Sequence, residues 1–448
     1  MQIGKYIFFQ SDNVRTSLIK KNVLISVFIK GGSVCVAFLL VPITIDYINP
    51  MQYGVWLTIS SMIYWISVFD IGIGNGLKNE IAYSIAVNDE RNLKKYVSTS
   101  YAILTLITVG IFSLFWLGTY FVDWNDLLNV KALNMDITPV VLLFIGFFCI
   151  QFVVQLIDAI ISATQQVFIS SLILLIGQLS GLILVYILKH FIPGSLFLLV
   201  IVIAGSSVVT LVLASIYLYS TKFKKFAPSF KSIDFSFVKR LLNVGGSFFL
   251  IQIGAMVLIY SNNFIITKVL GPESVTLYNI PFKLFSFISL LFSIIITPYW
   301  SAFTDAYAKK DMDWIKDNIR KLRLIWLGLS SLGVVILLLS DFLYKIWIQN
   351  AVTVPLSLSI MMFIYIIIYT WQTLHVYFLN GIGKIKLQLF VVIAGAVINI
   401  PLAVYLGKIF GLNGILGANI LIFFVMAIIF TIQHDKIVKQ TAKNLWNK

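Results

Sequence analysis

Residues 25–42 read ISVFIKGGSVCVAFLLVP, a stretch that is apolar at almost every position and that holds one charge, Lys30. An apolar run of about 20 residues is long enough to cross a hydrocarbon core as a helix. Lys30 lies nine residues after Lys21, the last charge before the run. That separation corresponds to roughly 13 Å of helical rise, which is close to mid-depth. The stretch therefore predicts a membrane helix, and a lysine at that depth costs about 2.5–3.5 kcal/mol on insertion scales.

The rest of the chain has the same character. Its 448 residues are 59% hydrophobic and 11% charged, and the mean hydropathy is +0.96. Such a composition excludes a soluble globular protein and predicts an all-α integral membrane protein. The apolar runs long enough to cross a membrane are residues 22–45, 53–75, 97–122, 138–162, 166–188, 195–219, 241–267, 276–303, 322–347, 354–380, 385–407 and 412–433.

The basic residues indicate the orientation of these twelve predicted spans. Of the 33 basic residues, 26 lie in segments on the same side as the N-terminus and five lie on the opposite side. Because cytoplasmic segments carry the excess of Lys and Arg, we expect both termini to be cytoplasmic. The net charge of +15 then reflects topology rather than a nucleic-acid partner. The two remaining basic residues, Lys30 and Lys283, fall inside predicted spans.

The two halves of the chain resemble each other. A shift of 222 positions aligns residues 49–70 with residues 271–292 without a gap and places Pro50 on Pro272. Six spans per half give both halves the same topology, so we expect two six-helix bundles related by an axis along the membrane normal. The predicted domains are an N-terminal bundle over residues 1–220, a cytoplasmic linker over 221–240, and a C-terminal bundle with a short cytoplasmic tail over 241–448.

Lys30 and Lys283 come from the two different halves, so both could face one cleft between the bundles. A cleft with an excess of lysine attracts an anion, and an ammonium group is a good partner for phosphate. The alternative for either lysine is that its long stem carries the amine to a membrane interface. Asp70 is either a partner of one lysine or an ordinary charge at a helix end.

Polar uncharged side chains in the predicted seventh span add to this cleft. Gln252, Asn262 and Asn263 could hydrogen-bond sugar hydroxyls, although most such residues join helices to one another. The sequence GQLSG at residues 177–181 is a small-residue pattern typical of close helix packing.

Features typical of enzymes are missing from the sequence. It contains no phosphate-binding P-loop and no paired carboxylates in an aqueous loop, and its three histidines, His190, His375 and His434, are scattered. A membrane-embedded glycan polymerase would need an extramembrane catalytic loop, and the predicted outer loops are short. We therefore expect a transporter rather than an enzyme, with no cofactor and no bound metal; coupling to H⁺ or Na⁺ is left open.

Several stretches resemble a known family. YGVWLTISSMIYWISVFDIGIGNGLKNEIA (residues 53–82), SNNFIITKVLGPESVTLYNIPFKL (residues 261–284) and GLNGILGANI (residues 411–420) are similar to segments of Wzx-type polysaccharide flippases of the multidrug/oligosaccharidyl-lipid/polysaccharide exporter superfamily. The resemblance implies two six-helix bundles in a V-shaped, MATE-like arrangement. It also implies transport of undecaprenyl-pyrophosphate-linked oligosaccharide across the bacterial cytoplasmic membrane for O-antigen or capsule assembly. A polysaccharide polymerase and a chain-length regulator are the protein partners to expect.

The resemblance extends to the site. The resemblance implies a cationic lumen suited to a pyrophosphate, and Lys30 and Lys283 fit this expectation. Asp70 and Asn75 fall within the first similar stretch. The functional rival is a multidrug or cation antiporter of the same superfamily, which typically places acidic residues in its first and seventh spans. Here the first span has Lys30, and residues 241–268 contain no acid. Asn262 and Asn263 stand where relatives often have an acidic residue, which leaves coupling by that route in doubt.

Overall fold

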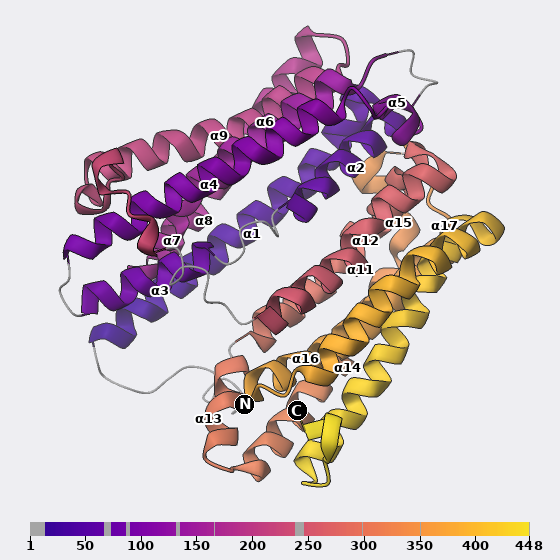
Figure 1. Cartoon of the computed structure of the whole chain (residues 1–448). Coiled ribbons are helices and arrows are strands. Elements are labelled where there is room, and N and C mark those ends of the chain that lie inside the picture. The colour runs from indigo at the N-terminus through magenta and orange to yellow at the C-terminus, as the bar shows by residue number, and fades with distance from the viewer. Residues whose placement is uncertain are drawn as a thin grey trace. The chain divides into compact units, whose positions relative to one another are not determined.

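The computed structural model describes residues 14–66, 73–86, 90–130, 135–164, 166–237, 246–297, 299–349 and 351–447. Within these ranges the regular structure is entirely helical. Clustering of contacts divides the chain into two units (Figure 1). The N-terminal unit comprises Met1–Ile43, Phe69–Phe121 and Pro139–Val244, and the C-terminal unit comprises Thr44–Val68, Val122–Thr138 and Gly245–Lys448. The domain boundaries expected from the sequence, after residues 220 and 240, stay a prediction.

The N-terminal unit is built from long apolar helices and a short irregular segment at its end. The helices are α1 (Val14–Ile48, whose last turn belongs to the other unit), α3 (Ile73–Ala86), α4 (Glu90–Gly118), α6 (Thr138–Val154), α7 (Leu156–Ala163), α8 (Val167–Phe191) and α9 (Leu196–Ser220). Three short 3₁₀ helices follow α9: η4 (Lys224–Phe226), η5 (Phe230–Ser232) and η6 (Phe235–Phe237).

The closest helix pairing in this unit joins α8 to α9 through small residues. A Cβ built on Gly177 would lie 3.2 Å from the Cα of Ser207, and one built on Gly181 would lie 3.0 Å from the hydroxyl of Ser206. The Ser206 hydroxyl donates to the carbonyl of Gly177 at 3.3 Å. The small-residue pattern at residues 177–181 therefore makes the close helix contact that the sequence predicts.

The C-terminal unit contains the remaining helices: α2 (Pro50–Ile66), α5 (Trp124–Leu127), α11 (Gly246–Leu270), α12 (Pro272–Ile296), α13 (Tyr299–Ala308), α14 (Met312–Leu338), α15 (Ser340–Ile348), α16 (Leu356–Ile382), α17 (Lys386–Val438) and the short η7 (Asn444–Asn447). Helices α11 and α16 both pack along α17, and α2 packs on α11 and α12 (Figure 1). Fully buried aromatic side chains, among them Phe285, Phe303 and Phe430, fill the centre of this unit.

Helix α17 is two membrane helices joined at a glycine. Gly411 has φ 61° and ψ −142°, which interrupts the helix. A Cβ built on Gly414 would lie 2.0 Å from the carbonyl oxygen of Leu406, so the chain turns back closely on itself there. The predicted break between the spans at 385–407 and 412–433 therefore falls at the observed interruption.

The helices confirm the predicted fold class of about twelve spans. Ten helices in the described part of the chain are long and apolar enough to cross a membrane. Dividing α17 at Gly411 adds an eleventh span. Helix α2 corresponds to the first part of the predicted second span, 53–75, of which residues 67–72 lie outside the described residues and residues 73–75 begin α3. Exposed apolar side chains cover these helices, as expected where lipid replaces water.

Candidate functional site

The predicted cleft residues are described to different extents. Lys30 lies in α1 and Asn75 in α3, but the structure does not describe their side chains. Asp70 lies outside the described residues. Gln252 lies on α11 with an exposed side chain. The side chains of Lys283, Asn262 and Asn263 are described, and all three residues belong to the C-terminal unit.

Lys283 lies near the middle of α12, in a candidate membrane span that runs from Pro272 to Ile296. Its side chain is half-buried, and its Nζ donates to the hydroxyl of Tyr53 on α2 at 3.3 Å. Tyr53 itself is 3% exposed. This contact supplies no counter-ion to the lysine, because a hydroxyl group is uncharged.

Helices α2 and α12 can bring Lys283 to Tyr53 because they cross at very short range. A Cβ built on Gly54 would lie 1.7 Å from the carbonyl oxygen of Pro272, so only glycine fits at this position. On the other side of the crossing, the hydroxyl of Thr276 donates to the carbonyl of Pro50 at 2.6 Å. The 222-residue shift carries Pro50 onto Pro272 and Gly54 onto Thr276, so the two contacts are equivalent under the repeat. The repeat in the sequence thus appears as a two-fold arrangement of this helix pair.

Polar groups continue along the seam between α2, α11 and α12. The hydroxyls of Thr58 and Thr267 lie 2.6 Å apart, and the side-chain amide of Asn263 donates to the carbonyl of Leu57 at 3.4 Å. Asn279 donates to the Asn263 side-chain oxygen at 2.9 Å. Lys283 lies one helical turn after Asn279 on α12, so these groups and the lysine form one polar seam.

Asn262 belongs to a separate, fully buried network. Its side-chain oxygen accepts from Asn419 at 2.8 Å, and Asn419 in turn accepts from Asn399 at 2.9 Å. All three asparagines are at most 1% exposed. The network joins α11 to both segments of α17, so its evident role is packing; contact of Asn262 or Asn263 with a substrate stays a prediction.

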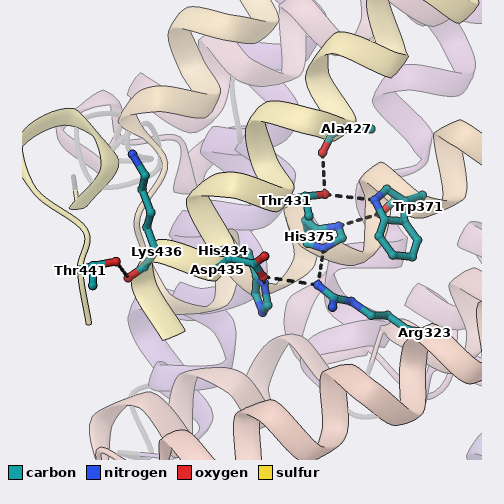
Figure 2. A network of polar contacts seen from close by, with 9 residues as sticks. All are labelled: Arg323, Trp371, His375, Ala427, Thr431, His434, Asp435, Lys436 and Thr441. Atoms are coloured by element: carbon teal, nitrogen blue, oxygen red, sulfur yellow. Dashed lines mark hydrogen bonds and ion pairs between the residues drawn. The ribbon is translucent and has the colours of Figure 1, made fainter. Parts of the chain in front are cut away.

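A charged cluster that sequence reasoning missed joins α14, α16 and α17 (Figure 2). The guanidinium of Arg323 lies 3.5 Å from the Asp435 carboxylate and 3.5 Å from Nε2 of His375. Nδ1 of His434 lies 2.9 Å from the same carboxylate. The expectation that the histidines are scattered is therefore wrong for His375 and His434, whose ring centroids are 5.3 Å apart.

The partners of His375 assign its proton. Nδ1 lies 3.0 Å from the carbonyl oxygen of Trp371, which can only accept, so Nδ1 carries the hydrogen and Nε2 receives the bond from Arg323. The Arg323 guanidinium also lies 5.4 Å from the Trp371 ring centroid. A neutral His375 is thus fully bonded although its side chain is completely buried. Arg323 precedes His375 by 52 residues in the chain, and His434 follows still later. No local sequence pattern therefore predicts that these three side chains meet.

The N-terminal unit has a cavity of its own. It has a volume of about 250 Å³ and is lined by residues of α3, α4 and α7, among them Gly74, Lys78 and Asp158, and by Gln155, which directly precedes α7. Gly74 and Lys78 belong to the stretch that resembles the flippase family. This stretch therefore contributes to a cavity that is also lined by the half-buried carboxylate of Asp158.

The helices define a polytopic membrane protein, and Lys283 lies within one of its candidate spans. Solved structures support this class by fold alone. An inward-facing multidrug resistance MATE family transporter of the MOP superfamily superimposes with a TM-score of 0.70 at 15% identity, over 91% of this chain and 95% of the other. A MOP superfamily transporter from Pyrococcus furiosus, whose structure is described as having a binding pocket of reverse polarity, gives 0.61 at 15% identity, over 95% and 97% of the two chains.

Sequence comparison identifies the family. The model of the polysaccharide biosynthesis protein family matches residues 19–304, more than half of the chain, and the chain belongs to this family. A MatE model matches residues 247–405. A "Putative O-antigen export protein" of Yersinia pseudotuberculosis is 24% identical over 79% of this chain and 81% of its own length. A "Putative O-antigen transporter" of Salmonella typhi is 23% identical over 85% and 87%.

Proposed function

We propose that this chain is a flippase that moves undecaprenyl-pyrophosphate-linked oligosaccharide repeat units across the bacterial cytoplasmic membrane by alternating access. The observation that carries the proposal is the similarity to proteins named for O-antigen export over about four fifths of the chain. One solved neighbour carries a multidrug name, but at 15% identity it supports only the fold. The sequence has Lys30 in its first span and no acid in residues 241–268, which disfavours cationic drugs.

The chemistry around Lys283 fits an anionic headgroup. Among the described residues, the ammonium has one hydrogen-bond partner, the uncharged hydroxyl of Tyr53, at the long end of hydrogen-bonding distance. A pyrophosphate oxygen would form a charge-assisted bond that is roughly twice as strong as a neutral one, so it would replace the hydroxyl as the main partner. Lys30 of the other half is the proposed second contact, and the lipid tail stays in the bilayer.

The remaining polar residues are assigned more general roles in this proposal. Asn263 and Asn279 lie on the same seam as Lys283 and would meet the sugar groups that follow the pyrophosphate. A polysaccharide polymerase and a chain-length regulator are the proposed partners on the outer side. The driving force of the cycle is left open; if it is coupled to H⁺ or Na⁺, the half-buried Asp158 in the N-terminal cavity is one carboxylate available for the coupling.

The deciding experiment is a deletion strain in which lipid-linked oligosaccharides and surface polysaccharide are quantified together. We expect undecaprenyl-pyrophosphate-linked repeat units to accumulate and the surface polymer to disappear, and both to be restored by the wild-type chain. Unchanged lipid intermediates together with new sensitivity to cationic drugs would overturn the proposal in favour of an exporter.

A further inference from the structure

Residues 221–237, the described part of the segment that follows α9, contact the membrane helix α4. Residues 221–237 are described as three short 3₁₀ helices, η4 to η6. The backbone N–H of Ser229 donates to the hydroxyl of Ser98 on α4 at 3.0 Å, and that of Asp234 donates to the hydroxyl of Thr99 at 3.0 Å. The segment is therefore fixed to the first turns of α4.

An ion pair strengthens this attachment. The Asp234 carboxylate accepts from Lys95 Nζ at 3.1 Å and from the Ser236 hydroxyl at 2.6 Å. The bond from Ser236, followed by the contact with Lys95, lowers the pKa of Asp234 below its ordinary value. Phe237 packs edge-on against Tyr96 with ring centroids 4.7 Å apart. The segment thus has a defined position on the N-terminal unit.

The contacts on α4 set the depth of the segment. Ser98 and Thr99 lie within the candidate membrane span Asn92–Gly118. One turn further along α4, the hydroxyl of Tyr101 meets that of Tyr219 at 3.0 Å, and Tyr219 is the second-last residue of the span formed by α9. Tyrosines at span ends mark the membrane–water interface. The segment is therefore level with the lipid headgroups.

The outer surface of the segment is aromatic and basic. Phe230 is 94% exposed and Phe235 is 55% exposed, whereas Phe223 is 2% exposed. The segment contains four exposed lysines, Lys222, Lys224, Lys225 and Lys231, and its single acid is Asp234, which is paired with Lys95. A large apolar side chain surrounded by lysines is typical of surfaces that bind an anionic bilayer.

We propose that residues 221–237 form a membrane-surface anchor, in which Phe230 inserts into the headgroup region of the leaflet and the surrounding lysines contact the phosphates of anionic phospholipids. A bilayer fits better than a protein partner because α4 holds the segment at the level where lipid is already present. The anchor fixes the start of the connection between the two halves to both the N-terminal unit and the lipid surface.

Spin labelling in proteoliposomes tests the depth of Phe230. The background lacks Cys35 and Cys149, both of which are free thiols, and the labelled variants are Phe230→Cys, Leu106→Cys and Asp313→Cys. Leu106 is 63% exposed near the middle of the candidate span Asn92–Gly118, and the Asp313 side chain is 93% exposed at the start of α14. In vesicles that contain phosphatidylglycerol, we expect Phe230→Cys to be more accessible to oxygen than to a water-soluble nickel complex, to a degree between the two references. Accessibility equal to that of Asp313→Cys would overturn the proposal.

Trypsin cleavage after Lys231 tests the unlabelled segment. In purified proteoliposomes that expose this face, we expect the wild type to be cleaved at least several-fold more slowly than Phe230→Ser, and the difference to shrink in vesicles of phosphatidylcholine alone. Equal cleavage of the two proteins in phosphatidylglycerol vesicles would contradict the anchor. Protection that appears only in crude membranes would indicate a protein partner and would also overturn it.

Discussion

Lys283 combines an unfavourable position with a weak partner. A lysine in the middle of a membrane span is expensive to insert, and the contact with Tyr53 at 3.3 Å offsets only part of that cost. A structural role would favour a carboxylate partner or a hydrophobic replacement. The position therefore makes most physical sense if a transient anion supplies the missing charge during the transport cycle.

The first prediction concerns the charge of Lys283. Replacing Lys283 by Ala should lower flipping by about tenfold to a hundredfold, because one charge-assisted hydrogen bond is worth roughly 1.5–3 kcal/mol. Lys283→Arg should retain more activity than the alanine variant. The measurement is the amount of surface polysaccharide and of lipid-linked repeat units in complemented deletion strains.

Lys345→Ala is the matched control for Lys283→Ala. Lys345 pairs with Asp341 at 2.7 Å, and both side chains are largely exposed, so its loss should leave flipping unchanged. Normal transport by Lys283→Ala, at wild-type abundance in the membrane, would show that the cation at residue 283 does not contact the substrate.

The second prediction concerns the close contact at Gly54. A Cβ at this position would overlap the carbonyl oxygen of Pro272, so Gly54→Ala must push α2 away from α12. Overpacking of this kind typically costs about 1–3 kcal/mol, and here it also separates Tyr53 from Lys283. We expect a lower melting temperature in detergent and reduced transport.

Gly110→Ala provides the comparison, since Gly110 lies within α4 and a Cβ built on it has nothing within 4 Å. In an exposed helix interior, alanine is favoured over glycine by roughly 1 kcal/mol, so this variant should melt at the same temperature or higher. If Gly54→Ala has the same melting temperature as Gly110→Ala, α2 and α12 do not approach each other as closely at Gly54 as the structure shows.

At the scale of helices, the cluster around Arg323 connects three elements by charge. Arg323 contributes from α14, His375 from α16, and His434 and Asp435 from α17. With neutral imidazoles the cluster has no net charge, because the positive charge of Arg323 and the negative charge of Asp435 compensate each other. This arrangement is consistent with three helices that move as one body.

The third prediction is that Arg323 and Asp435 are energetically coupled. In a double-mutant cycle with Arg323→Met and Asp435→Asn, we expect a coupling free energy of about 1 kcal/mol in the free energy of unfolding in mixed micelles. The exposed pair Asp341 and Lys345, spaced i, i+4 on one helix, should give about 0.3–0.5 kcal/mol. Equal coupling in the two pairs would mean that the cluster adds nothing beyond a surface ion pair.

At the scale of the whole molecule, most of the fold that can be predicted from the sequence follows from the lengths of its hydrophobic runs. The spans, the break near Gly411 and the small-residue contact of α8 with α9 follow from local patterns, because a membrane helix must satisfy its own backbone. The meeting of Arg323 with His375 and His434 does not follow, since it depends on how three helices are rotated about their axes. The same limitation applies to Lys283, whose depth is predictable although its partner Tyr53 is not.

The last prediction tests whether α2 must part from α11 during the cycle. The hydroxyls of Thr58 and Thr267 lie 2.6 Å apart, so cysteines at both positions are within disulfide reach in a background without Cys35 and Cys149. Alternating access requires at least two arrangements of packed helices, and a covalent link between α2 and α11 allows only one arrangement of this pair. We expect an oxidant to form the link and to reduce flipping to background, a reductant to restore it, and each single-cysteine variant to be insensitive to both. Complete cross-linking with normal flipping would show that α2 and α11 stay together throughout, and that the moving contact lies elsewhere.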